Sequence, residues 1–510
     1  MTLYESCKVA IIVSFLGFAF IAFGFLIQNE NVNLFYTITN SFVLFLSELF
    51  LKIGQAIIMN LPLIFMVNIA CKKANSGSPV IVAIIGYFAY LVTTMLFADQ
   101  TLGNQAYVST YGINSILNVV SGNRYPLETG LIGSLLVGFA TRISFIHSRH
   151  RSAFSFLTFF NKDSAAVLFN ILLCVLAGIG VSYLFPMFYN LIQKLIVYIS
   201  GDLMDSTRIG FFSAADRFLS TLGLGNIIKQ PFWFTALGGS YSTVAGQSVL
   251  GDVNIWNYIS DASSSYAGCG RFITPYYVIN MFMVPGIYLG ILFSMSDKKA
   301  RRKYYLPFAC AIILSVIAGN PLPVELLMLF TSPLLYILYI VCVGITSGAL
   351  VNYNVFLGYA TTNTNTVIAM PGSFPDYIVN LRNPVLYDSV MGILFIGLVA
   401  GVVCFIITMI YYRLLAFDFA RIGRAEKMAD NIIDAVGGLD NVVDSGSCLF
   451  KVNVSLNNLE DMNYEKLKEL GVRRITETKS GLSLELGTSC HIIASKIKKI
   501  IKNAHKAITA

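Results

Sequence analysis

The side chain best suited to covalent chemistry in this chain is the thiol of Cys448. It lies in the stretch VGGLDNVVDSGSCLFKVNV, at the head of a small polar segment that follows more than four hundred predominantly apolar residues. A thiolate attacks phosphorus well, so a cysteine at such a place can carry a phosphoryl group. The alternative is a buried thiol at the edge of a strand that takes no part in chemistry.

Five of the ionisable side chains in the apolar part of the chain are singled out as candidates. A charge inside a membrane costs several kcal/mol unless it is paired or wetted, so each of them is a candidate for function. The alternative for Arg217 and Glu325 is an ion pair that only holds a discontinuous helix. The five are Asp216, Arg217, Lys229, Asp252 and Glu325.

Composition places these residues in a membrane protein. The chain has 510 residues, of which 56% are hydrophobic and 12% charged, and a mean hydropathy of +0.69. The net charge of +8 comes from basic clusters beside apolar segments. This distribution is typical of the positive-inside rule and argues against a nucleic-acid partner, which would need a basic face.

Apolar stretches long enough to cross the hydrocarbon layer predict about ten transmembrane helices. The first lies at 8–27 and lacks a small-residue cleavage site, so we expect a retained span rather than a signal peptide. Basic clusters beside these stretches predict that both termini lie in the cytoplasm. The further stretches lie near 40–70, 79–98, 126–146, 164–188, 273–294, 303–319, 324–347 and 389–415.

Two regions, 200–272 and 319–388, contain too much Gly, Pro, Ser and Asn for simple spans. Irregular backbone at membrane depth is tolerated where protein buries it or where it lines a wet cavity. We therefore predict re-entrant segments and the substrate site there; the alternative is that both regions are ordinary loops.

The tail changes from helical to alternating periodicity. We expect strands at 448–456, 471–478 and 481–486 and a basic amphipathic helix at 491–503. The predicted fold class is an α-helical polytopic membrane protein plus a small cytoplasmic α/β domain with an antiparallel sheet. Its parts are a membrane domain at 1–420, a linker at 421–430 and the small domain at 431–510. The nine cysteines show no metal-ligand spacing and imply no disulfide framework.

Five segments, in order along the chain, resemble the enzyme IIC and IIB components of one family of the bacterial phosphoenolpyruvate-dependent sugar phosphotransferase system, the glucose, N-acetylglucosamine and maltose family. NLPLIFMVNIA from Asn60 is similar to the family's NLPLLFAIGVAIG, and GDVN from Gly251 to GDIN. DRFLSTLGLGNIIKQPFW from Asp216 resembles NRLLIPFGLHHxLNxxFW. GNPLPVEL from Gly319, followed by SPLLY, resembles GITEPIEF followed by APLLY. GGLDNVVDSGSC resembles GGKENIKNVDAC with identical spacing, which places Cys448 on the phosphorylated cysteine.

The resemblance implies a IIBC permease that couples sugar uptake to phosphorylation. In such a protein the IIB domain takes phosphate from a partner IIA domain onto its cysteine and passes it to a sugar held by IIC. It implies no bound cofactor, since the phosphoryl group is relayed from phosphoenolpyruvate through partner proteins. The chain shows no recognisable IIA segment, so another protein would supply it. The resemblance also implies a homodimer in the lipid of the bacterial inner membrane.

The sequence departs from the family at both sites. The family follows its cysteine with T-R-L-R, whereas this chain retains one cation, Lys451, and has Asn453 at the second basic position. Lysine lacks the fork that matches phosphate bidentately, so phosphate handling should be weaker. In the membrane domain Gly225 and Asn226 replace the paired histidines of GLHH, and Leu322 replaces the glutamate of TEP.

The remaining residues define the predicted site. Arg217 aligns with a family arginine, and Glu325 aligns with the second glutamate of EPIEF. The two catalytic candidates are Cys448 as the nucleophile and Glu325 as the proton acceptor. The expected phosphate ligands are Lys451 and Asn453, and Trp233 is expected to stack on a sugar ring or simply to pack. The predicted sugar ligands are Asp216, Arg217, Asn226, Lys229, Trp233 and Asp252.

Two alternatives follow from the departures. The first is a catalytically impaired relative that acts as a membrane sugar sensor or regulator. The second is a facilitator that moves sugar without phosphorylating it. The identity of the sugar does not follow from the residues, because the recognisable polar contacts are those that have changed.

Overall fold

The computed structural model describes most of the residues of the chain. They are 2–28, 38, 40–71, 78–103, 106–107, 124–148, 164–243, 246–262, 268–295, 298–358, 372–381, 383–414, 425–448, 451–459, 462–470, 472, 474–478, 481–486, 490, 493–498 and 500–501.

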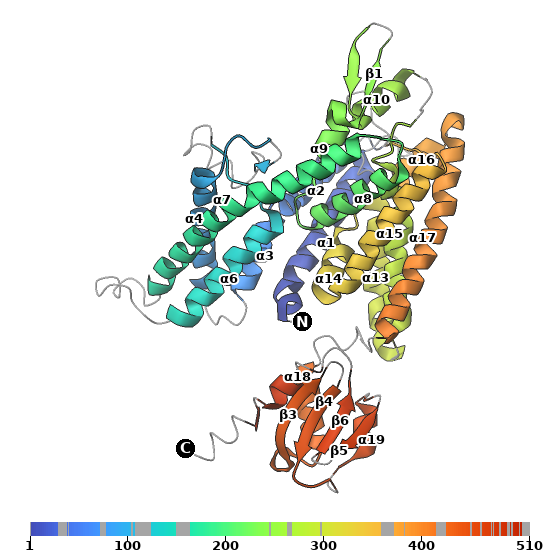
Figure 1. The fold of residues 1–510 in the computed structure, drawn as a ribbon. Coiled ribbons are helices and arrows are strands. Elements are labelled where there is room, and N and C mark those ends of the chain that lie inside the picture. Colours follow the sequence, from blue (N-terminus) through green and yellow to red (C-terminus); the bar gives the residue numbers. More distant parts are fainter. Residues whose placement is uncertain are drawn as a thin grey trace. The chain divides into compact units, whose positions relative to one another are not determined.

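The chain divides into two compact units. The larger unit comprises 2–285 and 311–402, and the smaller comprises 286–310 and 403–510. Both the helical part and the sheet-containing tail are visible in Figure 1. The predicted fold class is confirmed: the protein is mostly helical, with a small antiparallel sheet near its carboxyl end.

The helical part is built from long apolar helices and several short ones. Among the described residues, eight helices are long and apolar enough to cross a bilayer, against the expected ten or so, and three shorter apolar helices accompany them. The elements are α1 (Thr2–Gln28), α2 (Ser41–Met59), α3 (Leu61–Ala70), α4 (Ser78–Phe97), α6 (Gly130–Ser148), α7 (Ser164–Ser200), α8 (Ser206–Thr221), α9 (Asn226–Phe234), η3 (Ala236–Gly238), α10 (Asp252–Ala262), α11 (Thr274–Val278), η4 (Ile279–Met283), α12 (Val284–Ser294), α13 (Lys298–Ala318), α14 (Leu322–Thr331), α15 (Pro333–Asn352), α16 (Phe374–Leu381), η5 (Pro384–Leu386) and α17 (Tyr387–Leu414).

Two stretches predicted as single spans are broken helices. The stretch 40–70 divides at Asn60, which caps α2 and is followed by Pro62 in the first turn of α3. The stretch 324–347 divides at Ser332, directly before Pro333. Proline favours the first turn of a helix and cannot donate to the preceding turn, so each stretch forms two helices.

The two irregular regions are mainly short helices. Region 200–272 forms α8, α9 and α10, with a hairpin of β1 (Ser240–Ser242) and β2 (Ser248–Leu250). Region 319–388 contains α14, α15 and α16, so the expectation that it lacks simple spans is wrong for α15, a candidate membrane span. Residues 359–371 of that region lie outside the described residues.

Helix α8 packs along α15, and small residues set this contact. A Cβ atom at Gly210 would lie 2.8 Å from the carbonyl oxygen of Gly344, and one at Gly348 would lie 2.9 Å from that of Ser206. Small residues four apart let membrane helices approach closely. This approach brings the carboxyl-terminal half of α8, which carries two predicted site residues, beside α15.

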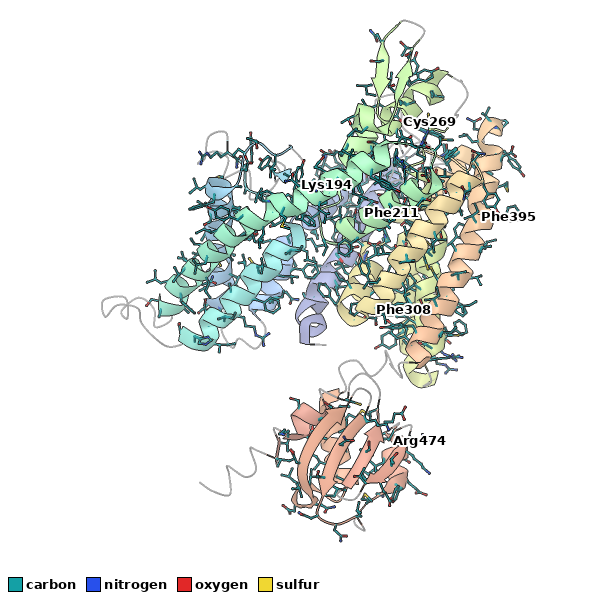
Figure 2. The ribbon with its side chains drawn as sticks, in the orientation of Figure 1. Lys194, Phe211, Cys269, Phe308, Phe395 and Arg474 are labelled. Atoms are coloured by element: carbon teal, nitrogen blue, oxygen red, sulfur yellow. The ribbon has the colours of Figure 1, made fainter. Side chains whose placement is uncertain are left out.

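The outward faces of the long helices are apolar. Phe395 of α17 points away from the neighbouring helices in Figure 2, and 66% of its surface is exposed. Leu184 of α7 and Ile345 of α15 are similarly exposed, at 68% and 69%. Exposed apolar side chains on spans of this length are typical of lipid contact.

The tail is a sheet covered by helices. Strands β3 (Val442–Cys448), β4 (Lys451–Leu456), β6 (Gly481–Glu485) and β5 (Ile475–Thr478) pair antiparallel in that order. The other elements are α18 (Ala425–Ala435), η7 (Leu439–Asn441) and α19 (Tyr464–Glu469). Buried residues of β4 and β6 share one core with α18 and the helical residues 493–498.

The tail differs from expectation at its first strand. The strand predicted at 448–456 is wrong at its start, because Cys448 ends β3 and β4 begins at Lys451. The sequence VVDSGSC of β3 is polar and rich in small residues, so it gives no strand signal of its own. Helix α18 begins at Ala425, so part of the stretch predicted as a linker is the first helix of this fold.

Candidate functional site

Helix α8 supplies the polar centre of the larger unit. Asp205 caps the helix by accepting a hydrogen bond from the N–H of Thr207. Asp216 and Ser220 are four residues apart, as are Arg217 and Thr221, so each pair shares a helix face. Asp216 and Arg217 are both buried, with 1% and 4% of their surfaces exposed.

Arg217 holds Glu325 of α14 in a bidentate ion pair. Its Nε donates to Oε1 at 2.9 Å and its Nη2 to Oε2 at 2.8 Å. Tyr339 of α15 donates to Oε1 at 2.8 Å, and Thr221 donates to Oε2 at 2.9 Å. A carboxylate has about four acceptor positions. Glu325 is fully buried. The four hydrogen bonds therefore occupy all the acceptor positions of its carboxylate.

Asp216 collects a second set of partners. Tyr276 of α11 donates to Oδ2, and Ser220 donates to Oδ1 at 3.0 Å. Lys229 of α9 lies 3.5 Å from Oδ1, and Arg217 lies 3.9 Å from Oδ2. The two carboxylates are therefore matched by two cations, which reduces the cost of burying charge. We call these four residues, Asp216, Arg217, Lys229 and Glu325, the ion network.

Aromatic rings cover the ion network. The ammonium of Lys229 lies 5.7 Å from the ring centroid of Trp233 and 5.5 Å from that of Tyr276. The guanidinium of Arg217 lies 5.5 Å from the Tyr276 ring. All three distances suit cation–π attraction. The indole N–H of Trp233 is buried and donates to no described residue.

Asp252 has its own partner in a separate loop. It lies in the first turn of α10 and is 2% exposed, and it accepts a hydrogen bond from the N–H of Gly270 at 3.0 Å. Burial raises the pKa of this carboxyl, which lies outside the long spans, to about 6. Its described contacts tie α10 to the loop before α11, and they do not include the ion network.

A cavity of about 370 Å³ adjoins the ion network. Ser220 and Thr221, which bond to the two carboxylates, form part of its wall, and Asn226 and Leu322 lie on the wall as well. Two of the three positions that replace family polar groups, Asn226 and Leu322, therefore line the same cavity, and Gly225 is not among its described lining. Its described lining is Ile58, Met59, Asn60, Leu61, Pro62, Leu63, Phe65, Tyr87, Leu91, Leu127, Glu128, Thr129, Gly130, Leu131, Ser220, Thr221, Leu222, Gly223, Asn226, Leu322 and Leu326.

Sequence reasoning missed Glu128, which lines this cavity directly before α6. Its Oε1 accepts a hydrogen bond from the N–H of Gly130 at 3.1 Å. Burial raises its pKa to about 7 and the bond from Gly130 lowers it in part. The signal was available: Glu128 is an ionisable residue at the start of the stretch predicted to span at 126–146, and such residues are functional candidates.

A glycine joins α6 to the end of α8 at the cavity wall. Gly130 has φ of +50°, and a Cβ atom there would lie 2.2 Å from the carbonyl oxygen of Leu222. That oxygen accepts a hydrogen bond from the N–H of Leu131 at 2.8 Å. A side chain at position 130 would therefore push the two wall segments apart.

We expect Gly130→Ala to lower the unfolding free energy by about 1–3 kcal/mol, because it adds backbone strain and a clash with a carbonyl group. Thermal unfolding in detergent measures the change. Gly180→Ala in α7 is the matched control, since a Cβ atom there meets nothing within 4 Å. Alanine should raise helix stability at that site by up to about 1 kcal/mol. Equal Tm values for the two variants would contradict the expected strain.

The tail places Cys448 opposite Lys451. The two residues are register partners in the β3–β4 ladder, and Asn453 pairs with Gly446 two positions further along. Lys451 and Asn453 are exposed, on the strand face opposite the buried Val452 and Val454. The side chain of Cys448 lies outside the described residues. The backbone thus brings the predicted nucleophile and the predicted cation to one end of the hairpin.

The second cysteine of the tail has a different environment. Cys490 is buried in the core of the tail, and burial raises its pKa to about 11. A thiol with this pKa stays protonated at neutral pH and is a poor nucleophile. Cys448 is therefore the better candidate of the two for carrying a phosphoryl group.

The fold and the cavity are those of a polytopic membrane protein that can hold a small polar solute, and comparison with known proteins identifies the family. The model of the phosphotransferase system EIIC family matches residues 9–344. The chain belongs to this family, which confirms the resemblance in its sequence, and it is a phosphotransferase-system sugar permease. The match includes α8, α9, α14 and the cavity lining.

Two curated relatives are similar over nearly the whole chain. The glucoside-specific EIICBA component of Staphylococcus carnosus (strain TM300) is 23% identical over 512 residues, which cover 94% of this chain and 70% of the relative. The glucose-specific EIICBA component of Staphylococcus saprophyticus subsp. saprophyticus is 24% identical over 510 residues, with the same coverage of 94% and 70%.

Proposed function

We propose that this permease takes up a sugar of the glucose or glucoside class and phosphorylates it during uptake. The observation that carries the proposal is the cavity of about 370 Å³, in which hydroxyl, amide and carboxyl groups face an apolar wall. This volume falls at the small end of ligand sites, and a wall of mixed polarity suits a ring with hydroxyl edges and apolar faces. The names of the two relatives supply the sugar class.

The ion network serves this cavity as a fixed scaffold. Arg217 joins α8 to α14 through Glu325, and Asp216 joins α8 to α9 and α11 through Lys229 and Tyr276. Ser220 and Thr221 are held by the same carboxylates, so their orientation at the cavity wall is fixed before a sugar binds. Fixed polar groups reduce the entropy lost on binding.

Phosphorylation would occur by transfer from Cys448. A sugar hydroxyl oxygen attacks the phosphorus of S-phosphocysteine, the new O–P bond forms, and the S–P bond breaks with the thiolate as leaving group. The hydroxyl proton passes to a base. Lys451, opposite Cys448 in the hairpin, would offset the charge on the phosphoryl oxygens, with Asn453 as a neutral donor. The phosphate would come from phosphoenolpyruvate through a IIA domain.

The same proposal sets the membrane arrangement. Transfer from a cytoplasmic IIA partner requires the tail in the cytoplasm, and the basic clusters beside the apolar spans favour both termini there. We also propose that the permease is a homodimer embedded in membrane lipid. The topology is tested by introducing a cysteine at each terminus and labelling it with a thiol reagent that does not cross the membrane. Labelling in inverted vesicles but not in intact cells would show that the terminus is cytoplasmic.

A second function is favoured by one observation. Asn226 and Leu322 occupy the cavity wall at the positions of the family histidine and glutamate, and neither side chain can accept a proton. A permease without a base at these positions could bind or conduct sugar without phosphorylating it. It would then act as a facilitator or as a membrane sugar sensor.

One experiment separates these functions. Vesicles containing the full chain are given soluble phosphotransferase proteins, phosphoenolpyruvate and radiolabelled glucose, N-acetylglucosamine, maltose or a β-glucoside. Accumulation of sugar phosphate supports the proposal. Flux of free sugar that is equal with and without phosphoenolpyruvate would support a facilitator, and binding without flux would support a sensor.

A further inference from the structure

We propose that Glu128 is the catalytic base of this permease, accepting the proton of the sugar hydroxyl that attacks the phosphocysteine. The inference rests on the proposed function and assigns the chemical role left open by Asn226 and Leu322. It concerns a residue that lies outside the segments carrying the family resemblance.

Glu128 lies on the wall of the cavity. Among the described residues that line the cavity, Glu128 is the one carboxyl group, and none is a histidine. A general base must lie within hydrogen-bond reach of the proton that it accepts, or one water away. A sugar in this cavity meets Glu128 together with the hydroxyl of Thr129, the next residue.

The carboxylate of Glu128 has fewer partners than that of Glu325. Glu325 accepts four hydrogen bonds, two of them from Arg217, and it is absent from the described cavity lining. Protonating it would remove the partner of a buried guanidinium. The Glu128 carboxylate, by contrast, accepts one hydrogen bond from the described residues, that of the Gly130 N–H, and forms no ion pair with any of them. Its second carboxylate oxygen is therefore the better acceptor for a sugar proton.

The surroundings of Glu128 make its carboxylate more basic than that of an exposed glutamate. Glu128 lies against α4, whose titratable side chains Tyr87 and Tyr90 face it and bring no positive charge. Burial raises the pKa of Glu128 to about 7. A general base is most effective when its pKa is near the working pH, because it is then both deprotonated and basic enough to take a proton. An exposed glutamate would be a much weaker base.

The local fold holds this base in place. Gly130, two residues on, donates its N–H to Oε1, and the hydroxyl of Tyr90 donates to Thr129 at 3.2 Å. Gly130 also meets the end of α8 through Leu222. The proton transferred to Glu128 replaces a negative charge on the carboxylate with a neutral acid, and it returns to solvent after the sugar phosphate leaves. No further reactant is needed.

The test compares Glu128→Gln with the unmodified full chain in vesicles. Glutamine keeps the size and hydrogen bonding of the side chain but cannot take the proton. We expect the phosphorylation rate at saturating sugar to fall by about 10²–10⁴-fold, the range for removal of a general base. Sugar affinity, measured by the rise of Tm with sugar, should change much less. Unmodified protein should show a rate that rises with pH through about 7, since the deprotonated carboxylate is the active form.

Two further variants keep the test decisive. Glu128→Asp retains a carboxyl group and should keep a rising pH limb at a reduced rate, which a merely structural role would not produce. Glu48→Gln makes the same chemical change at an exposed position of α2 outside the described cavity lining and should leave the rate unchanged. An active Glu128→Gln variant with an unaltered pH limb would overturn the inference alone. Unmodified protein that phosphorylates no tested sugar would overturn the proposed function and the inference with it.

Discussion

Cys448→Ser is expected to abolish phosphoenolpyruvate-dependent sugar phosphorylation, with a loss on the order of 10⁴-fold or more, as for removal of other enzymatic nucleophiles. A serine hydroxyl is far less acidic than a thiol and is a poorer nucleophile and leaving group at neutral pH. The measurement uses vesicles with radiolabelled phosphoenolpyruvate and soluble phosphotransferase proteins, followed both as label on the chain and as sugar phosphate.

The matched control is Cys490→Ala in the same tail. Cys490 is buried in the tail core, and its raised pKa keeps it protonated. Its replacement should leave labelling and sugar phosphorylation intact if the tail still folds, which circular dichroism of the full chain checks. Label that persists in Cys448→Ser and disappears in Cys490→Ala would show that the phosphoryl group is carried elsewhere than proposed.

In the tail, the alternation of apolar and polar residues predicts some strands and misses another. Val452 and Val454 alternate with exposed residues, so the sequence predicts β4 as a half-buried strand. The sequence of 481–486 predicts a strand for the same reason. Strand β3 has Asp, Ser and Gly where a strand would normally carry β-branched residues, and a bulge between Val442 and Asp444 shifts its register. Because β3 is an edge strand, it needs fewer residues with high strand propensity than a central strand. It is therefore identified by its pairing with β4 and not by its sequence.

The membrane part shows a similar division. Long apolar runs predict where spans lie, because crossing a bilayer requires about 20 apolar residues. They do not predict the breaks at Asn60 and Ser332, since the sequence is apolar on both sides of each position. Prolines at 62 and 333 were the available signal, yet proline within apolar helices occurs without a break in α7, at Pro186.

The site was partly predictable. The cost of buried charge marks Asp216, Arg217, Lys229 and Glu325, and the structure brings all four together. The same argument also marks Asp252, which bonds to a different loop. Charge alone does not say which residues share a site, because that depends on how helices pack. Likewise, the cavity wall joins segments from 58 to 326, a set that only the tertiary fold defines.

The ion pair between Arg217 and Glu325 yields the second large effect. We expect Arg217→Leu to lower the unfolding free energy by about 3–5 kcal/mol, the cost of leaving a buried charge without its partner. Glu325 would keep its bonds from Thr221 and Tyr339 but lose both charged ones. Denaturant titration of the full chain in detergent micelles measures this loss.

Helix α8 supplies a matched control in Arg208→Leu. Arg208 pairs with Asp205 at 3.4 Å, but their side chains are 27% and 36% exposed. Water already solvates much of this pair, so its removal should cost less than about 1 kcal/mol. The double variant Arg217→Leu with Glu325→Leu removes both buried charges, and it should recover part of the stability lost by Arg217→Leu. Equal losses for Arg217→Leu and Arg208→Leu would show that the buried pair is not what ties α8 to α14.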